Sequence, residues 1–259
     1  MKKAITYMQY LAEYLRHGDL MSVISSVKYM INKTSHTRNR IIRTSIGTFY
    51  CRKNTNDFQF ANYHYEWGVK KFILSRASDF TVFIDGGACI GDYSILLAKR
   101  NMRCFAFEPI AENYAAMIKN LQLNNMVCRV KAFYTGLGNE NKKVRFHFNP
   151  VNTGASHIDR NGNTDSFSGE LRTFDSMLEK LKIGKEENIL FKLDVEGMES
   201  EALQGSADFI RQYPNITFIV EDKISGKDSI RSVLSGIAKF EFGIVDEFNM
   251  YARKLKNLT

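Results

Sequence analysis

The 259-residue chain has few of the residues that define several special protein classes. It has three prolines, one tryptophan, no internal repeat and no low-complexity stretch, which excludes collagen-like and repeat architectures. Its four cysteines form no CxxC pair and no zinc-type cluster with histidine. They are Cys51, Cys89, Cys104 and Cys128. Three of them lie in apolar runs, so we predict reduced core thiols and no metal site.

Long hydrophobic runs are also missing. No segment approaches the roughly 18–20 consecutive apolar residues that a membrane-spanning helix needs. Two lysines occur near the N-terminus, but Gln9 and Glu13 interrupt the apolar residues after them, and no small-residue cleavage site follows. We therefore predict a cytoplasmic protein without a signal peptide or a transmembrane segment.

Negative charge is scarce in the first sixty residues. This segment contains ten Lys and Arg residues and three acidic residues, which gives it a net charge of +7. The net charge of the whole chain is +8. This asymmetry predicts a basic, mainly helical extension with a short strand pair over residues 1–60 and a main domain over 61–259. Four roles for the extension stay open: a solvated surface, a site for an anionic or lipid-linked acceptor, a membrane surface, and a homodimer contact.

Apolar residues at helical spacing predict two helices within residues 2–33. Val23, Val27 and Met30 belong to the second helix, for which Asp19 is the predicted N-cap. A strand pair around 46–50 and an amphipathic helix over 62–75 are predicted next.

From residue 81 onward, apolar strands alternate with helices. Strands are predicted at 81–85, 103–108, 127–132, 188–194 and 215–221, followed by a strand pair around 240–251. Helices are predicted up to residue 99 and at 111–124, 174–181, 199–211 and 228–238. Between 136 and 172 the alternation gives way to strand-like pieces, one of them at 154–157, and polar loops. Repeated βα units predict a doubly wound, mostly parallel α/β sheet covered on both faces.

The strongest local motif is Asp85-Gly86-Gly87-Ala88-Cys89-Ile90-Gly91, where the first strand turns into a helix. Glycines there let the backbone turn sharply and approach a ligand closely. An empty tight turn is the alternative. Glu108, followed by Pro109, ends the next strand and can accept hydrogen bonds from both ribose hydroxyls of an adenosine-containing cofactor. The carboxylate of Asp85 would repel a pyrophosphate but suits a sulfonium cofactor with a free amino group.

Three charged residues end the strand predicted at 188–194. Lys192, Asp194 and Glu196 alternate with apolar residues, so their side chains are expected on the same side of the strand. Charges at the end of an apolar strand are costly to bury unless they are paired or used. They predict either an ion-pair cluster or a catalytic or acceptor-orienting group.

Five segments resemble the FkbM family of methyltransferases in order and spacing over about residues 55–222. They are FIDGGACIGDYS, FAFEP, KNLQLNN, LRTFDSML and KLDVEGMESEALQG. The resemblance implies a seven-stranded class I methyltransferase fold of the Rossmann-like type, S-adenosylmethionine as donor, and O-methylation of a sugar, a glycan or a natural-product hydroxyl. Two departures stand out: Cys89 replaces the usual Asn, and Phe174-Asp175-Ser176 replaces Leu-Asp-Asp. The first could alter cofactor affinity. The second leaves only one of the family's two adjacent aspartates, so a role for that aspartate pair is in doubt in this chain.

Methyl transfer to a hydroxyl needs a group that takes the hydroxyl proton. Our hypothesis is that Asp194 is this general base or orients the acceptor through a metal-bound or ordered water, with Glu196 and Lys192 setting its pKa. His157, in the polar 149–168 segment, is a second candidate base. The predicted cofactor contacts are Asp85, Gly86, Gly87, Ala88, Gly91, Glu108 and Pro109.

Other functions of the same fold stay open. Nucleobase N-methyltransferases resemble one another in an Asn/Asp-Pro-Pro-aromatic motif, whereas this chain has Asp194-Val195-Glu196-Gly197 at that point. The difference argues against a nucleic-acid acceptor. RNA methylation and a non-catalytic interaction module on a degenerate methyltransferase fold are the alternatives.

Overall fold

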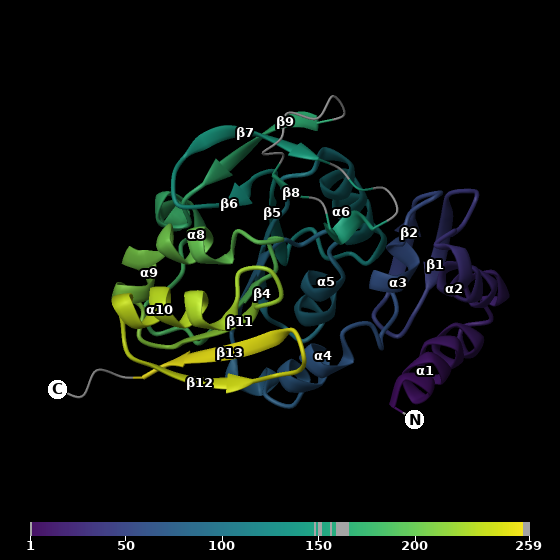
Figure 1. Cartoon of the computed structure of the whole chain (residues 1–259), viewed down its shortest axis with the longest axis horizontal. Coiled ribbons are helices and arrows are strands. Elements are labelled where there is room, and N and C mark those ends of the chain that lie inside the picture. The colour runs from purple at the N-terminus through teal and green to yellow at the C-terminus, as the bar shows by residue number, and fades with distance from the viewer. Residues whose placement is uncertain (1, 148, 150–151, 156, 159–165, 256–259) are drawn as a thin grey trace.

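A seven-stranded sheet forms the centre of the computed structural model, which describes residues 2–147, 149, 152–155, 157–158 and 166–255 (Figure 1). In order across the sheet, the strands are β12 (Phe240–Ile244), β13 (Asn249–Lys254), β11 (Ile216–Glu221), β10 (Ile189–Leu193), β3 (Val82–Gly86), β4 (Arg103–Phe107) and β5 (Val130–Phe133). The five strands from β11 to β5 are parallel, and β13 is antiparallel to both of its neighbours. The predicted doubly wound, mostly parallel α/β fold is confirmed.

Strands β3 and β10 lie side by side at the centre of the sheet and are buried along their whole lengths. Both are runs of apolar residues, as expected for parallel strands covered on two faces. The sheet grows from this pair in opposite directions, through β4 and β5 on one side and β11 on the other. The carboxyl ends of β3 and β10 therefore form the topological switch point, where ligands bind in this architecture.

Helices cover both faces of the sheet (Figure 1). They are α4 (Trp67–Leu74), α5 (Asp92–Ala98), α6 (Ala111–Leu123), α7 (Leu178–Leu181), α8 (Glu199–Gln204), α9 (Ala207–Gln212) and α10 (Lys227–Ile237), with 3-10 turns η1 (Ala77–Asp79) and η3 (Asp175–Met177). Within the described residues, no helix is both long enough and apolar enough to cross a lipid bilayer.

The first sixty residues form two helices, a hairpin and a short third helix. They are α1 (Lys2–Arg16), α2 (Leu20–Asn32), β1 (Arg40–Arg43), β2 (Thr48–Cys51) and α3 (Asp57–Phe60). Asp19 caps α2 as predicted, because its side chain accepts the N–H of Ser22 at 3.1 Å. Strand β2 is anchored on α6, since the N–H groups of Thr48 and Tyr50 donate to side chains of that helix end at 3.0 and 2.7 Å.

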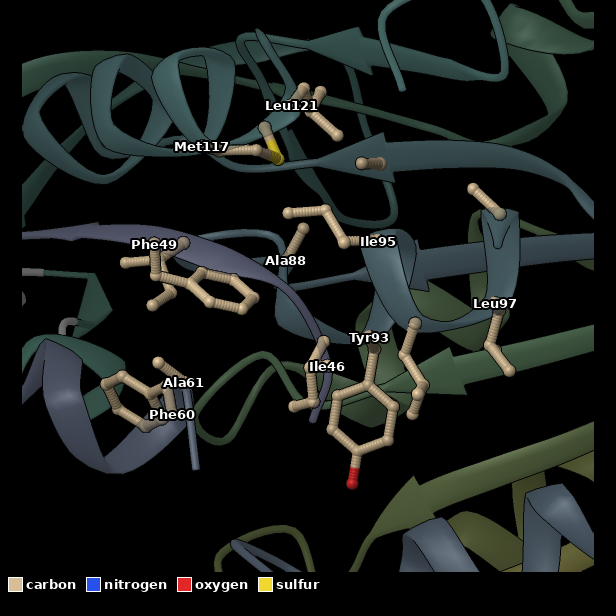
Figure 2. Packing of buried hydrophobic residues seen from close by; sticks show 14 of the residues in the cluster. Ile46, Phe49, Phe60, Ala61, Ala88, Tyr93, Ile95, Leu97, Met117 and Leu121 are labelled. Carbon is tan, nitrogen blue, oxygen red and sulfur yellow. The ribbon is translucent and has the colours of Figure 1, made fainter. Parts of the chain in front are cut away.

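One apolar core joins this N-terminal segment to the main sheet (Figure 2). Ile46 and Phe49 pack in the same cluster as Ile95 of α5 and Met117 and Leu121 of α6, and all five are at most 1 % exposed. Burial of these side chains holds the hairpin against the helices that follow β3 and β4. The boundary at residue 60 stays a prediction from charge.

A small four-stranded sheet interrupts the alternation after β5. Its order is β6 (Gly136–Leu137), β9 (Ser166–Arg172), β7 (Lys142–His147) and β8 (His157–Ile158). The predicted strand-like piece at 154–157 is wrong in its first half, because Thr153–Ala155 form the 3-10 turn η2. Strand β8 begins only at His157.

Three predicted helices differ from the structure. The helix expected over 174–181 is α-helical only from Leu178 to Leu181, because Asp175–Met177 form the 3-10 turn η3. The helix expected over 199–211 is divided into α8 and α9 at Gly205, where a Cβ atom would lie 1.9 Å from the carbonyl oxygen of Gly138. The helix expected over 62–75 begins only at Trp67, because Glu66 before it has a left-handed backbone with φ of +48°.

Candidate active site

A pocket opens at the carboxyl ends of β3, β4 and β10, at the switch point of the sheet. Most residues that the sequence predicts for the site line this pocket. They are Asp85, Gly87, Ala88, Glu108, Pro109, Lys192, Asp194 and Glu196. Gly86 and Gly91 lie in the glycine turn beside it.

The glycine turn brings two strand ends into close contact. Gly87 has φ of +88°, and a Cβ atom on it would lie 1.9 Å from the carbonyl oxygen of Asp194. Gly86 is less tightly packed, since a Cβ there would lie 2.8 Å from a methyl carbon of Leu193. Gly91 has φ of +83° and is the N-cap residue of α5, where a Cβ atom would lie 2.9 Å from the side chain of Met117. These glycines therefore set the shape of the pocket wall between β3 and β10.

Glu108 is fixed at the end of β4 by backbone N–H groups. Its Oε2 accepts from Cys89 at 2.8 Å and its Oε1 from Ile110 at 2.9 Å. Burial raises the pKa of Glu108 to about 7, and the two backbone hydrogen bonds act in the opposite direction. The carboxyl group is thus held in one orientation on the pocket wall.

Asp85 lies at the end of β3, is 2 % exposed and accepts a hydrogen bond from Oγ of Ser94 at 2.6 Å. Burial raises its pKa to about 7, against the opposing effects of Lys192 and of that hydrogen bond. Two carboxyl groups with raised pKa values on one pocket wall favour a ligand that brings positive charge.

Lys192 is the buried cation of the site. Its Nζ lies 2.7 Å from Oδ2 of Asp194 and 3.9 Å from Oε2 of Glu66. Burial alone would lower the pKa of Lys192, but Asp194, Glu66 and Asp85 outweigh burial and raise it. Lys192 therefore stays charged and holds Asp194 in place.

Glu196 reaches the pocket by a different route from the one that the sequence predicts. Strand β10 ends at Leu193, so the expected alternation stops before Glu196, which has φ of +52°. Burial and the charge of Asp194 raise the pKa of Glu196 to about 7. Glu221, at the end of β11, lines the same pocket, and burial with Asp194 and Glu196 raises its pKa to about 8.

Several pocket residues escape the sequence reasoning, above all Glu66. Burial raises its pKa, while Lys192 opposes this, and its Oε2 accepts a hydrogen bond from the hydroxyl of Tyr93 at 2.8 Å. Behind it, Nζ of Lys70 forms a buried ion pair with Asp92 at 3.2 Å. The sequence offers one sign of Glu66, a single acidic residue among the aromatic residues of positions 63–67. Its partner Lys192, however, lies more than a hundred residues away in the chain.

The small sheet and the turn η2 also contribute to the pocket lining. Phe146 of β7 and Leu171 of β9 are apolar lining residues, and Thr153 of η2 lines the pocket next to Cys89, with 3.7 Å between its Oγ1 and Sγ of Cys89. The N–H of Thr153 donates to Asn56 at 2.9 Å, and its carbonyl accepts from Asn113 at 3.1 Å. The backbone of His157 pairs with His147, but the His157 side chain lies outside the described part of the structure.

Across the described residues, no group of three or more His, Cys, Asp or Glu side chains is arranged to hold a metal ion.

A model of the methyltransferase FkbM domain family matches residues 85–244, which include the glycine turn, Glu108 and the Lys192–Asp194 pair. The chain belongs to the FkbM methyltransferase family.

Two solved structures are similar to this chain. A SAM-dependent methyltransferase from Agrobacterium tumefaciens superposes with a TM-score of 0.51 at 8 % identity, covering 86 % of this chain and 72 % of that one. A methyltransferase FkbM from Methylobacillus flagellatus gives a TM-score of 0.49 at 17 % identity over 68 % of this chain. This FkbM-family chain spans only 44 % of the length of that protein. No curated protein matches the sequence.

The two departures from the usual FkbM pattern have different places in the structure. Cys89 belongs to the pocket wall, where its N–H holds Glu108. Asp175 instead accepts the N–H groups of Asp208 and Phe209 at 2.9 and 2.8 Å, at the start of α9. In this chain Asp175 therefore caps a helix.

Proposed function

We propose that this FkbM-family chain is an S-adenosylmethionine-dependent O-methyltransferase that acts on a hydroxyl of a sugar, a glycan or a natural-product-like small molecule. The observation that carries the proposal is the Lys192–Asp194 pair in the pocket that Asp85 and Glu108 also line. Membership of the family supports methyl transfer. The basic residues among the first sixty support an acceptor that is anionic or lipid-linked.

The acidic ends of β3 and β4 fit the polar groups of S-adenosylmethionine. We assign the two ribose hydroxyls to Glu108, whose carboxylate is held by two backbone N–H groups. We assign the positively charged amino group to Asp85. The other predicted contacts are Gly86, Gly87, Ala88, Gly91 and Pro109. When bound, this donor supplies a methyl group that a positively charged sulfur makes electrophilic.

We assign proton removal from the acceptor hydroxyl to Asp194. Lys192 donates to Oδ2 of Asp194 at 2.7 Å, so Oδ1 is the atom that takes the proton as the acceptor oxygen attacks. Lys192 keeps the carboxylate oriented, and Glu196 bounds the acceptor side of the pocket. Phe146 and Leu171 limit the access of water, which strengthens these charge interactions.

The identity of the acceptor is tested first, with isotopically labelled donor offered to glycan, nucleotide, RNA and small-alcohol acceptors. Mass spectrometry then reports which acceptor gains the label. Labelled glycan or alcohol supports the proposal. Labelled RNA alone would replace it with nucleic-acid methylation, and no donor binding by calorimetry would favour the non-catalytic alternative.

Asp194→Asn tests the base on the acceptor found. We expect turnover to fall by about 10²–10⁴-fold while the Kd for the donor changes little, because a general base acts only on the proton transfer. His157→Ala is the matched experiment for the second candidate base. Near-wild-type turnover of Asp194→Asn, together with a large loss in His157→Ala, would reassign the role.

A further inference from the structure

Helix α2 faces the protein with its polar side and exposes its apolar side. Its buried residues are Ser22, Ser25, Ser26 and Tyr29, which follow one another at helical spacing. The opposite side of the helix carries Leu20, Ile24, Val27 and Ile31, which are 63, 45, 43 and 79 % exposed. A surface helix normally buries its apolar stripe, so this orientation leaves a row of four aliphatic side chains in contact with solvent.

Neighbouring elements extend the exposed apolar surface. Helix α1 exposes Tyr7, Met8 and Leu15. A pocket lined by residues of α1, α2 and α3, Tyr7 and Met30 among them, continues it between the helices. Strand β1 is tied to α2 by the Arg40–Asp19 ion pair at 2.8 Å and exposes Ile41. We call these exposed side chains of α1, α2 and β1 the N-terminal face. The three elements lie together at one edge of the molecule (Figure 1).

The charges around the N-terminal face have one sign. The exposed basic residues are Arg16, Lys28, Lys33, Arg38, Arg43 and Lys53. All three acidic residues among the first sixty are buried, and each has a partner inside the protein. Glu13 accepts from Ser45, Asp19 pairs with Arg40, and Asp57 pairs with Arg52. The exposed surface of residues 6–60 therefore combines aliphatic side chains with positive charge and carries no carboxylate.

We propose that the N-terminal face docks on an anionic lipid bilayer, with α2 lying in the plane of the interface. The aliphatic row of α2 would enter the boundary between headgroups and acyl chains, where its burial is favourable. Lys28 and Lys33, on and just after the same helix, would meet anionic headgroups, as would the basic residues of the following segment. This inference does not depend on the proposed methyl transfer.

Two other partners fit the N-terminal face less well. In a symmetric dimer the same patch would meet itself, and six exposed basic residues on each copy would oppose one another without an exposed carboxylate between them. RNA would satisfy the positive charge, but the aliphatic side chains of Leu20, Ile24 and Ile31 would gain no burial against phosphates and offer no aromatic ring on which a base could stack.

Vesicle co-sedimentation of the full chain tests the proposal. We expect binding to vesicles of phosphatidylcholine with about one third phosphatidylglycerol, weakening as salt screens the charges, and at least about tenfold weaker binding to phosphatidylcholine alone. Ile24→Ser/Ile31→Ser should lower the partition coefficient about tenfold or more. Lys28→Gln/Lys33→Gln should lower it by roughly fivefold for each charge removed.

Ile244→Ser is the matched control, because Ile244 is 68 % exposed and lies on the distant strand β12. It should bind vesicles like the wild type. Each variant replaces exposed side chains, so an unchanged Tm and unchanged donor affinity verify that the fold is intact. Equal binding by Ile24→Ser/Ile31→Ser and the wild type would overturn the proposal. The proposal would also be overturned if vesicles bound neither the wild type nor this variant, while the wild type formed a concentration-dependent dimer and the variant did not. That result would identify a second copy of the chain as the partner.

Discussion

At the scale of single residues, Cys89 combines an unfavourable backbone conformation with a precise contact. Its φ of +47° lies in the left-handed region, where residues with a Cβ are uncommon. That conformation directs its N–H toward Oε2 of Glu108, 2.8 Å away. The pocket therefore retains backbone strain of roughly 1 kcal/mol in order to hold a carboxylate.

Replacing Cys89 with asparagine should relieve this strain. Asparagine tolerates the left-handed region better than cysteine, and Oγ1 of Thr153, now 3.7 Å from Sγ, offers a polar neighbour. We expect Cys89→Asn to raise the free energy of unfolding by about 0.5–1 kcal/mol and to preserve donor affinity. Thermal unfolding and calorimetry measure both. Cys89→Val is the control in the opposite direction and should destabilise the protein, since β-branched residues fit the left-handed region of backbone conformation worst. If Cys89→Val were more stable than Cys89→Asn, the strain argument would be contradicted.

The residues that sequence reasoning found share one property. Asp85 lies in the last residues of an apolar strand, and Glu108 and Asp194 each follow one directly, so the strand end itself places them at the mouth of the sheet. Glu66 and Tyr93 lack this property, because Glu66 precedes α4 and Tyr93 lies in the first turn of α5. Their contact with each other and with Lys192 depends on how the helices pack.

At the scale of elements, apolar spacing predicts that a helix exists better than it predicts the ends of the helix or its buried face. Ala202, Leu203, Phe209 and Ile210 are all buried, so one continuous helix is the natural prediction for 199–211. At the division, Gly205 lies in close contact with Gly138, and the N–H groups of Asp208 and Phe209 donate to Asp175 instead of continuing the helix. Helix α2 is predicted from Val27 and Met30, yet both are exposed and serines are buried.

Gly205→Ala tests whether this contact is rigid. A Cβ there would lie 1.9 Å from a backbone oxygen, which cannot move as a flexible side chain can. We expect a loss of about 2 kcal/mol or more in the free energy of unfolding. Gly236→Ala in α10 is the matched control, because its Cβ would meet nothing within 4 Å, and it should stabilise by about 0.5–1 kcal/mol. Denaturant titration measures the free energy of unfolding of both variants. Equal values for the two would show that the backbone at Gly138 moves to accommodate the new Cβ at little cost.

At the scale of the whole molecule, the pocket gathers carboxyl groups that keep protons near neutral pH. The pKa values of Asp85, Glu108 and Glu196 are raised to about 7, and that of Glu221 to about 8, in each case chiefly by burial. In the unfolded chain these groups lose their protons near pH 4–4.5. Between about pH 5 and 8 the folded state therefore binds more protons than the unfolded state, and these groups make the protein less stable as pH rises.

We expect the Tm measured without donor to fall from about pH 5.5 to 8, and Glu196→Gln/Glu221→Gln to reduce this fall. Each retained proton contributes up to about 1.4 kcal/mol per pH unit, and partial solvation lowers the combined effect of this variant to about 1–2 kcal/mol over the range. Glu241→Gln is the matched control, because Glu241 is partly exposed and its hydrogen bond from Arg253 lowers its pKa, so its titration lies below this window. A pH slope that the double variant leaves unchanged would show that Glu196 and Glu221 titrate normally.

The sequence by itself determined the α/β alternation, the glycine turn and the acidic residues at the ends of β3, β4 and β10. Each of these depends on neighbours in the chain: the period of two in a strand, the backbone freedom of glycine, and the polar residue that follows an apolar run. Only the tertiary structure decided that Glu66 meets Lys192, that a predicted helix is divided where Asp175 accepts N–H groups of α9, and that α2 turns its serines inward. Those outcomes depend on packing between segments far apart in sequence, where the surface that each helix meets sets which of its faces is buried.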